Sequence, residues 1–288
     1  MTQDDKVFRF LFEDLGIRGE IVRLRASAKT VFDNQTYPNH IASQLGQSLA
    51  AATLLAGTIK LDGSLILQTQ SDGPLHTLVA QATDEGTIRG LARWRDDVPI
   101  GNLNEMCGDG RLIFTIDAQG SERYQGIVEL AGDNLAMAID EYFKRSEQLR
   151  TKIWLMSDAQ YAAGLMLQHL PSSTASDDDW HRLELIMQTV QPEELYTLPV
   201  EDLLYRLFNE DRVRLYKPKN ISFNCNCSRE RIETTLRALG REDIDELIEE
   251  KGKISVDCEF CSKNYQFDEI DAASLFEDTN TTTSTAIH

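Results

Sequence analysis

Short runs rich in apolar residues, each closed by a turn signal, follow one another through the first half of the chain. Runs of this length bounded by Gly, Pro or Asp residues are typical of β-strands. Five strands are predicted on this basis: Ser64–Gln70, Leu75–Thr83, Thr87–Arg95, Leu112–Asp117 and Tyr124–Leu130. The turns between them are short, and short turns join antiparallel neighbours. They include Asp72-Gly73-Pro74, Glu85-Gly86 and Gln119-Gly120.

Two helices are predicted to cover this sheet. The first runs from about Pro38 to Lys60. The second begins after Asp133, a plausible N-cap, because apolar side chains then recur on one helical stripe. That stripe consists of Leu135, Ile139, Tyr142 and Phe143. The segment Met156–Leu170 fits either a strand or a helix. Residues 1–174 are thus expected to form an α+β domain, a large N-terminal antiparallel sheet with covering helices.

A linker signature of Pro, Ser, Thr and Asp residues follows at 171–179, and the apolar pattern then changes its period. Two amphipathic segments keep helical spacing. Their apolar positions are Leu183, Ile186, Met187 and Val190, and, after Pro199, Leu203, Leu204, Leu207 and Phe208. Isolated helices shorter than about 12–15 residues are marginal in water. A helical linker is therefore predicted at 175–220, docked in the resting state on the large domain.

The segment 221–276 is predicted to be a small C-terminal module. Ser228 can cap a helix that Gly240 stops, and a second, acidic helix ends near Gly252. The helical apolar positions are Ile232, Leu236, Leu239, Ile244, Leu247 and Ile248. Strands follow, with alternating Ile254 and Val256, then Tyr265 and Phe267. About 55 residues with so few large apolar side chains cannot build a self-sufficient core. Residues 277–288 are predicted to be a disordered tail.

Charge and apolar content limit the classes of partner. At 288 residues, 41% of them hydrophobic, the chain is long enough for one large and one small domain. Its formal net charge of −18 argues against binding a phosphate backbone, which requires clustered Lys and Arg. The predicted module is itself acidic between Glu242 and Glu250. The start, Met1–Arg9, is polar, and the longest apolar run, Ser48–Ile59, is too short to span a bilayer. We expect a cytoplasmic protein that binds neither nucleic acid nor membrane.

Four of the five cysteines lie in the last quarter of the chain, as Cys225-Asn226-Cys227 and Cys258-Glu259-Phe260-Cys261, separated by thirty residues. Two close thiol pairs supply the four soft ligands of a tetrahedral Zn²⁺ site. The predicted metal ligands are Cys225, Cys227, Cys258 and Cys261. Histidine does not compete, because His181 and His288 are not at knuckle spacing. Cys107 belongs to no motif and is expected to be a packed small side chain.

Other interpretations of these cysteines stay open. Buried unlinked thiols fit two clustered motifs poorly. Structural disulfides are disfavoured because Met1–Arg9 is polar and charged, without the apolar segment of a signal peptide, and because five cysteines in a chain of this length are not a small disulfide scaffold. A purely structural zinc site fits the motifs well. A thiol-disulfide oxidoreductase would place C-x-x-C at a helix start, not between two strands. A hydrolase lacks support, because neither G-x-S-x-G nor H-E-x-x-H is present, and His76 or Glu147 is more plausibly structural. No phosphate-binding Gly-rich loop is present either, and no enzyme activity is expected.

Over nearly its whole length the chain resembles the 33 kDa chaperonin family, the bacterial redox-regulated heat-shock chaperones. The most specific matches are the segment Cys225–Arg231 and the Cys258–Cys261 knuckle. The large domain adds Arg18-Gly19-Glu20, Asp72-Gly73-Pro74, Arg123-Tyr124-Gln125-Gly126 and the segment Tyr142–Gln148. The resemblance implies an ATP-independent holdase that binds unfolding client proteins through residues 1–174.

The same resemblance implies how activity is controlled. The reduced protein would hold one Zn²⁺ per chain and be inactive. Oxidation would release zinc, unfold the module and the linker, and give an active homodimer. The expected disulfides are Cys225–Cys227 and Cys258–Cys261, which the resemblance implies and which short sequence separation also favours. Residues 175–220 would then relay the redox state to the client-binding surface.

Overall fold

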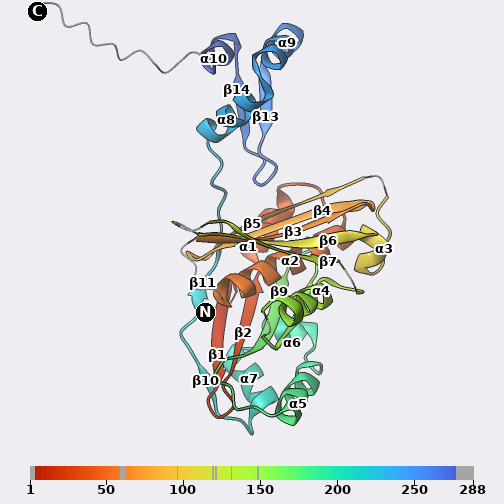
Figure 1. The fold of residues 1–288 in the computed structure, drawn as a ribbon, viewed down its shortest axis with the longest axis vertical. Coiled ribbons are helices and arrows are strands. Elements are labelled where there is room, and N and C mark those ends of the chain that lie inside the picture. Colours follow the sequence, from red (N-terminus) through yellow and green to blue (C-terminus); the bar gives the residue numbers. More distant parts are fainter. Residues whose placement is uncertain are drawn as a thin grey trace, which may run out of the picture. The chain divides into compact units, whose positions relative to one another are not determined.

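The computed structural model describes residues 4–58, 63–95, 97–118, 120, 122–130, 132–147 and 149–276. The chain divides into two compact units, Met1–Asn224 and Cys225–His288, whose elements are labelled in Figure 1. Several sequence predictions fall outside the described residues. These are the tail 277–288, Gln119 of one turn, Gln148 of one motif and the predicted helix end at Lys60.

The five predicted strands form one sheet of the first unit, called sheet B here. They are β3 (Gly63–Ser71), β4 (Leu75–Thr83), β5 (Thr87–Trp94), β6 (Gly110–Ala118) and β7 (Tyr124–Glu129). The strand order is β12-β5-β4-β3-β6-β7, and the five pair antiparallel as predicted. The two-residue strand β12 (Ser222–Phe223) adds a parallel pairing to β5. A short helix, α3 (Leu103–Cys107), precedes β6 and was not predicted.

A second sheet, sheet A, was largely missed by the sequence analysis. Its order is β10-β1-β2-β9-β8, with β11 also paired to β1, and all pairings are antiparallel. The strands are β1 (Lys6–Phe12), β2 (Ile17–Leu24), β8 (Thr151–Ser157), β9 (Ala162–His169), β10 (Val213–Leu215) and β11 (Lys219–Asn220). The ambiguous segment Met156–Leu170 is therefore the end of β8 followed by β9. Because β2 is buried at every position except Arg18, it shows no alternation that a pattern could detect.

Helix α2 (Asn39–Thr58) contacts strands of both sheets and forms the centre of the first unit. It is buried along its length and rich in Ala and Leu, as expected of a helix with apolar neighbours on several sides. Helix α1 (Ala26–Asp33) precedes it. Within the described residues, no helix combines the length and the apolar character needed to cross a bilayer.

The second predicted helix is α4 (Leu135–Tyr142), which continues into a π-helical turn, Phe143–Glu147. The predicted N-cap is wrong by one residue. The side chain of Asn134, not Asp133, accepts a hydrogen bond from the backbone N–H of Met137, at 3.0 Å. The Asp133 carbonyl instead accepts a bond from the backbone N–H of Leu103, which ties α4 to α3.

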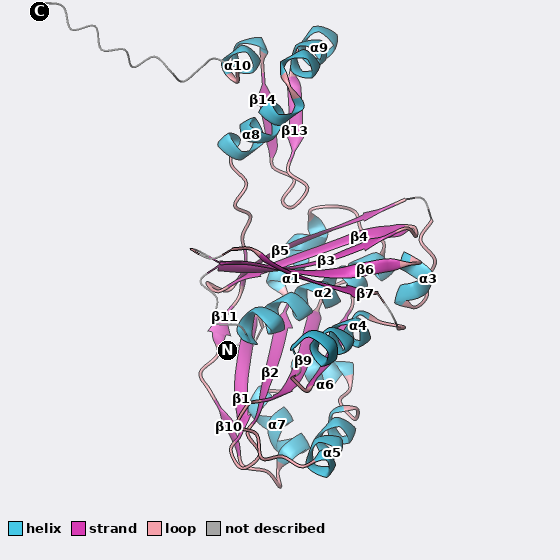
Figure 2. Ribbon diagram, viewed as in Figure 1, coloured by secondary structure: helices cyan, strands magenta, loops and turns pink. Residues whose placement is uncertain are grey.

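Three helices cover the outer face of sheet A, as Figure 2 shows. They are α5 (Asp177–Met187), α6 (Pro192–Thr197) and α7 (Val200–Phe208). The two predicted amphipathic segments correspond to α5 and α7, although Val190 lies beyond the end of α5. Ser176 caps α5, and a bidentate ion pair between Arg182 and Asp211 joins α5 to the turn after α7, with N–O distances of 2.9 and 2.6 Å.

The second unit follows its predicted outline. It contains α8 (Arg229–Leu239), α9 (Arg241–Lys251), β13 (Ile254–Asp257), β14 (Asn264–Phe267) and the unpredicted α10 (Glu269–Ser274). Ser228 caps α8 as predicted, and left-handed Gly252, with φ of 71°, ends α9. Leu239 lies on α8 as predicted, at its last position, where its side chain is 53% exposed. The apolar core of this unit is correspondingly small.

Glu20 on β2 is a buried carboxyl in the first unit, with only 2% of its surface exposed. Its Oε1 lies 3.3 Å from the Nε of Arg9, and its Oε2 has no hydrogen-bond partner. A Cβ at Gly57 of α2 would lie 2.2 Å from Oε2, so only glycine allows this approach. Burial raises the pKa of Glu20 from 4.5 to about 7, against the smaller opposing effects of Arg9 and Arg18.

This raised pKa predicts a pH-dependent stability of the first unit. Between pH 4.5 and 7 the folded protein keeps a proton that the unfolded chain has lost, so stability should fall as pH rises through this window. Glu20→Gln should remove that loss and stabilise the protein at pH 8 by up to about 3 kcal/mol. The free energy of unfolding is measured by urea unfolding at pH 5 and pH 8, followed by the fluorescence of Trp94, Trp154 and Trp180. Asp33→Asn, a substitution at an exposed site, is the control and should keep the wild-type pH dependence. The same pH dependence in Glu20→Gln as in wild-type protein would contradict the raised pKa of Glu20.

Candidate metal centre

The two cysteine motifs of the second unit lie on short, locally fixed segments. Cys225 and Cys227 precede α8, whose start is held by the Ser228 side chain through the backbone N–H of Arg231, at 3.3 Å. Cys258 follows β13, and the chain turns sharply before β14. In this turn the backbone N–H groups of Cys261 and Ser262 donate to the carbonyl of Cys258, at 3.2 and 2.7 Å. The left-handed φ of Ser262, 56°, lets the chain reverse there.

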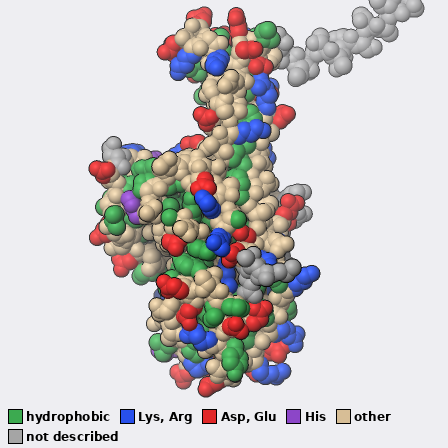
Figure 3. Space-filling model, turned by 180° about the vertical axis from the view of Figure 1, so that it is seen from behind, with side chains coloured by type: hydrophobic (Ala, Val, Ile, Leu, Met, Phe, Trp, Pro, Cys, Tyr) green, Lys and Arg blue, Asp and Glu red, His purple; other side chains and the backbone are tan. Residues whose placement is uncertain are grey.

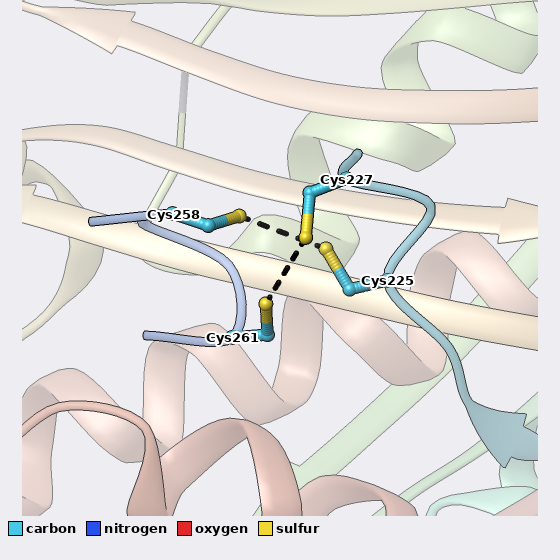
Figure 4. A group of neighbouring side chains, drawn as sticks. All are labelled: Cys225, Cys227, Cys258 and Cys261. Carbon is cyan, nitrogen blue, oxygen red and sulfur yellow. Dashed lines mark hydrogen bonds between the residues drawn. The ribbon is translucent and has the colours of Figure 1, made fainter. Parts of the chain in front are cut away.

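The four cysteines that the spacing singled out lie together, with their sulfurs pointing toward one another (Figure 4). The Sγ atoms of Cys225 and Cys258 are 3.7 Å apart, and those of Cys227 and Cys261 are 3.4 Å apart. All four sulfurs lie within 4.8 Å of one another. A tetrahedral zinc with bonds of about 2.3 Å requires sulfurs about 3.8 Å apart. The arrangement therefore fits one tetrahedral thiolate-bound metal ion.

The remaining cysteine, Cys107, and the histidines among the described residues belong to the first unit. Cys107 is fully buried in the first unit, and burial raises the pKa of its thiol to about 11, which makes it unreactive. His181 lies on α5, and His288 is outside the described residues. The other residues that the sequence analysis weighed, His76 and Glu147, lie on β4 and in the π-helical turn of the first unit.

Hydrogen bonds to sulfur surround the group. The backbone N–H groups of Phe260 and Cys261 point to the sulfur of Cys258, and that of Lys263 to the sulfur of Cys261. The hydroxyl of Tyr265 donates to the sulfur of Cys227, at 3.1 Å. Such donors stabilise negative charge on sulfur, as a metal-bound thiolate requires. Sequence reasoning treated Tyr265 only as an alternating strand residue and missed this contact.

The thiols differ in how readily they ionise without a metal. Burial raises the pKa of Cys227, but the hydrogen bond from Tyr265 and those of the neighbouring cysteines outweigh it and bring this pKa to about 7. Burial raises the pKa of Cys261 to about 12. A bound divalent cation would override this difference, because coordination favours the thiolate at every position. Since only Cys258 is buried and the other three are partly exposed, solvent reaches the site.

Arg229 ties the elements around the cysteines together, and the sequence analysis missed this role as well. Its guanidinium donates to the carbonyl of Gln266 at 2.9 Å, pairs with Asp271 at 2.7 Å and lies 4.2 Å from the centre of the Phe267 ring. One side chain thus joins α8, β14 and α10. The second unit thus has polar and cation–π contacts between its elements in addition to its small apolar core.

The C-x-x-C motif does not have the context of a catalytic dithiol. Cys258 and Cys261 lie in a turn between two antiparallel strands, whereas a redox-catalytic pair is expected at a helix start. Their sulfurs also lie close to those of the second cysteine pair. This placement favours metal ligation over thiol-disulfide catalysis.

Comparison with known proteins identifies the family of this chain. The family model described as Hsp33 protein matches residues 5–268. The chain belongs to the Hsp33 family. It is 56% identical over 276 residues to the 33 kDa chaperonin of Nitrosococcus oceani, covering 96% of each chain. It is 42% identical over 279 residues to that of Aliivibrio fischeri, covering 95% of this chain and 96% of the relative.

A solved structure extends the family match to the fold. The crystal structure of a 33 kDa chaperonin from Thermotoga maritima superposes with a TM-score of 0.83, covering 94% of this chain and 97% of that one. Its sequence identity is 22%, so this match concerns the fold alone. The predicted resemblance to the Hsp33 family and the predicted α+β fold class are both confirmed.

Proposed function

We propose that this protein is a redox-regulated, ATP-independent holdase chaperone, inactive when reduced and zinc-bound. The observation that carries the proposal is the group of four sulfurs within 4.8 Å, in a chain of the Hsp33 family whose relatives are named 33 kDa chaperonins. Zn²⁺ is the proposed ion, with one per chain, because four thiolates in tetrahedral geometry are its preferred structural ligand set. When bound, it would hold the four sulfurs as thiolates.

Oxidation of these sulfurs would remove the main support of the second unit. Structural zinc contributes apparent free energies of about 10–16 kcal/mol in small modules. A disulfide within either motif closes a loop of three or four residues and restricts the unfolded chain by only about 1.5–2 kcal/mol. The apolar core of the unit includes one of the ligands, Cys258, and is too small to replace the lost interaction. The unit should therefore unfold when the sulfurs are oxidised.

The surface available to clients would be the outer face of sheet A. The helices α5, α6 and α7 now cover it, and its side chains form one buried apolar cluster with theirs. The sheet side chains of that cluster are Phe8, Phe10, Phe12, Ile17, Ile21, Ala163, Leu165 and Leu167. On α7, Phe208 packs edge-on against Phe12, with ring centres 4.8 Å apart. Removal of the helices would expose this face, and a contiguous apolar patch on a protein surface is a typical binding site for other proteins.

The segment 175–220 is the proposed relay between the cysteines and this face. Residues 213–223 follow α7 and form β10 and β11 on sheet A and β12 on sheet B. The backbone N–H of Asn224 still donates to the carbonyl of Ile88, at 3.1 Å, and Cys225 comes next. Short edge strands of two or three residues contribute few ladder hydrogen bonds. They are therefore elements that local unfolding of the adjoining unit could release.

The remaining parts of the proposal concern partners and compartment. Unfolding proteins are the proposed clients, the oxidised form is proposed to be a homodimer, and the cytoplasm, where thiols stay reduced, is the proposed compartment. On the face drawn in Figure 3, acidic and basic side chains are interspersed and not gathered into a basic patch, which supports a role without nucleic acid. No catalytic step is involved.

The metal assignment predicts one zinc per chain in protein purified under reducing conditions. Cys258→Ser should lose most of the zinc, because it removes one of four ligands. Cys107→Ser is the matched control and should keep one equivalent, because this thiol lies in the first unit. Atomic absorption, run beside a free-thiol assay, measures both. Less than half an equivalent in reduced wild-type protein would count heavily against the site.

In the folded unit, sulfurs of different motifs already lie 3.4 and 3.7 Å apart, so proximity alone does not select the proposed disulfides, Cys225–Cys227 and Cys258–Cys261. A disulfide needs sulfurs about 2.05 Å apart, so every pair has to move before it closes. Once the unit has unfolded, short sequence separation favours closure within each motif.

Peptide mapping of the peroxide-oxidised monomer should therefore recover mainly disulfides within the motifs. Trypsin places Cys225 and Cys227 on one peptide and Cys258 and Cys261 on another, so links within a motif leave the two peptides separate. Reduced protein serves as the control. Recovery of the two peptides joined as the main product, through Cys227–Cys258 or Cys227–Cys261, would show that closure occurs within the folded centre instead.

Weakening the docking of α7 should activate the reduced protein. Leu207 is 6% exposed within the covering cluster, and Leu207→Ala should cost about 2–5 kcal/mol of docking stability. Suppression of client aggregation should then rise while zinc stays bound. Tyr205→Ala, on the same helix but at a side chain that is 74% exposed, is the control and should stay inactive. Equal amide protection across 177–215 in reduced and oxidised wild-type protein would refute the relay.

A client-aggregation assay before and after peroxide also separates the other possible functions. Stoichiometric suppression that appears only after zinc release supports the holdase. Catalytic turnover of a small disulfide substrate would favour a thiol-disulfide oxidoreductase. Zinc binding without any change in suppression after oxidation would leave a purely structural zinc module.

A further inference from the structure

We propose that Tyr265 is a positioning residue that sets how readily the cysteine centre is oxidised, by shielding the sulfur of Cys227. This inference rests on the proposed function, because it concerns the oxidation of the same four sulfurs. The phenol hydroxyl donates to Cys227 Sγ at 3.1 Å, a good length for a bond from oxygen to sulfur. The residue is 7% exposed, on β14 opposite Val256 of β13.

The contact is held in place by the fold of the second unit. Tyr265 and Phe267 point to the same side of β14, because alternate residues of a strand share a face, and both are buried in the small core. On the exposed side of the ring, the ammonium of Lys263 lies 5.1 Å from the ring centre. The hydroxyl therefore has a fixed direction, and it reaches a sulfur of the other motif, which is 38 residues away in sequence.

The hydrogen bond to Cys227 comes from a side chain, and this distinguishes Cys227 from Cys258 and Cys261. Cys258 and Cys261 accept bonds from backbone N–H groups within their own turn, which any sequence with that turn would supply. Cys227 precedes a helix in a C-x-C segment and depends on the phenol for the bond described here. A single substitution, Tyr265→Phe, removes this donor without altering the backbone or the shape of the ring.

The chemistry follows from the electron pair on sulfur. A thiolate attacks hydrogen peroxide at oxygen, so the S–O bond forms, the O–O bond breaks and hydroxide leaves, with sulfur oxidised to a sulfenic acid. A second thiolate then attacks that sulfur, forming the disulfide and releasing a second hydroxide. A hydrogen bond to the lone pair lowers the nucleophilicity of the thiolate in the first step, and one that positions the sulfur also supports metal ligation. Loss of the bond should make Cys227 more reactive and its bond to the metal weaker.

The test uses full-length, reduced, zinc-loaded protein treated with hydrogen peroxide, and zinc release is followed with a colorimetric chelator. Tyr265→Phe should release zinc about fivefold faster, the rate equivalent of about 1 kcal/mol for one hydrogen bond. Its zinc affinity, measured by chelator competition without oxidant, should fall by about 10-fold or more, as for other outer-shell partners.

A second readout separates shielding from general loosening of the unit. Limited alkylation with N-ethylmaleimide modifies Cys225 and Cys227, which lie on one tryptic peptide, residues 220–229, so fragmentation between them gives their ratio. Tyr265→Phe should raise modification of Cys227 relative to Cys225. The control Phe267→Leu loosens the same strand and face but keeps the phenol, and it should leave the ratio at the wild-type value.

The outcomes distinguish this inference from the proposed function. Reduced wild-type protein without zinc would defeat both. Wild-type protein that binds zinc and releases it with peroxide, together with an unchanged release rate and alkylation ratio in Tyr265→Phe, would overturn only the role of Tyr265. Faster release with the same ratio shift in Phe267→Leu would assign the effect to packing and also reject the shielding role.

Discussion

The first unit is organised by sheet A, a sheet that is apolar on both faces and therefore has to be covered twice. Along β2 and β9 almost every residue is buried, because α2 covers one face and the helices α5, α6 and α7 cover the other. The two covers differ in kind. Helix α2 is 20 residues long and lies between two sheets, whereas α5, α6 and α7 have 11, 6 and 9 residues and depend on the sheet for their stability. One face is thus covered by a single long helix that lies between two sheets, and the other by three short helices.

Polar contacts determine where the short helices dock on sheet A. Arg23, only 3% exposed near the end of β2, donates to the carbonyl of Leu198, at the end of α6. Burial lowers the pKa of Arg23 to about 10, against smaller opposing effects of the Asp4 and Glu201 carboxylates, so its charge is retained at physiological pH. Arg150 lies over the ring of Trp180 on α5 and pairs with Asp177. Such contacts specify where the helices dock, while burial of apolar area supplies most of the free energy of docking.

Sequence patterns predicted elements that turn residues bound or that have a polar and an apolar side. The strands of sheet B were found because turn residues bound them, and the stripes of α5 and α7 because polar residues mark their exposed sides. The strand β2 was missed because a segment buried on both faces has no such marker, and α6 because six residues are too few to show a period. The N-cap of α4 moved by one residue because Asp133 and Asn134 are both good caps, and only tertiary contacts select between them.

At the candidate site, too, the sequence pattern predicted some of the residues and missed others. The four candidate ligand positions followed from spacing, because a tetrahedral thiolate site requires close pairs of thiols in any fold. The partners of those thiols did not, since Tyr265 reaches Cys227 across 38 residues and Arg229 reaches three elements at once. Contacts of this kind depend on the register of β13 and β14, which the sequence analysis did not specify. An aromatic residue a few positions after the second cysteine pair was the one signal available.

Together these features explain how a binding surface could be regulated without nucleotide. Under the proposed function, oxidation does not have to create a new surface, because the outer face of sheet A is already apolar and already shaped for amphipathic helices. The linker helices are joined to that face by a short chain, and an intramolecular partner competes at an effective concentration in the millimolar range. A client at micromolar concentration cannot displace them while they are folded. Once the linker helices are destabilised, they have to fold before they can dock on the face. The entropic cost of this folding weakens their binding to the face, while the face itself is unchanged. The redox state of four sulfurs would then control client binding solely through the stability of the segment that covers the face.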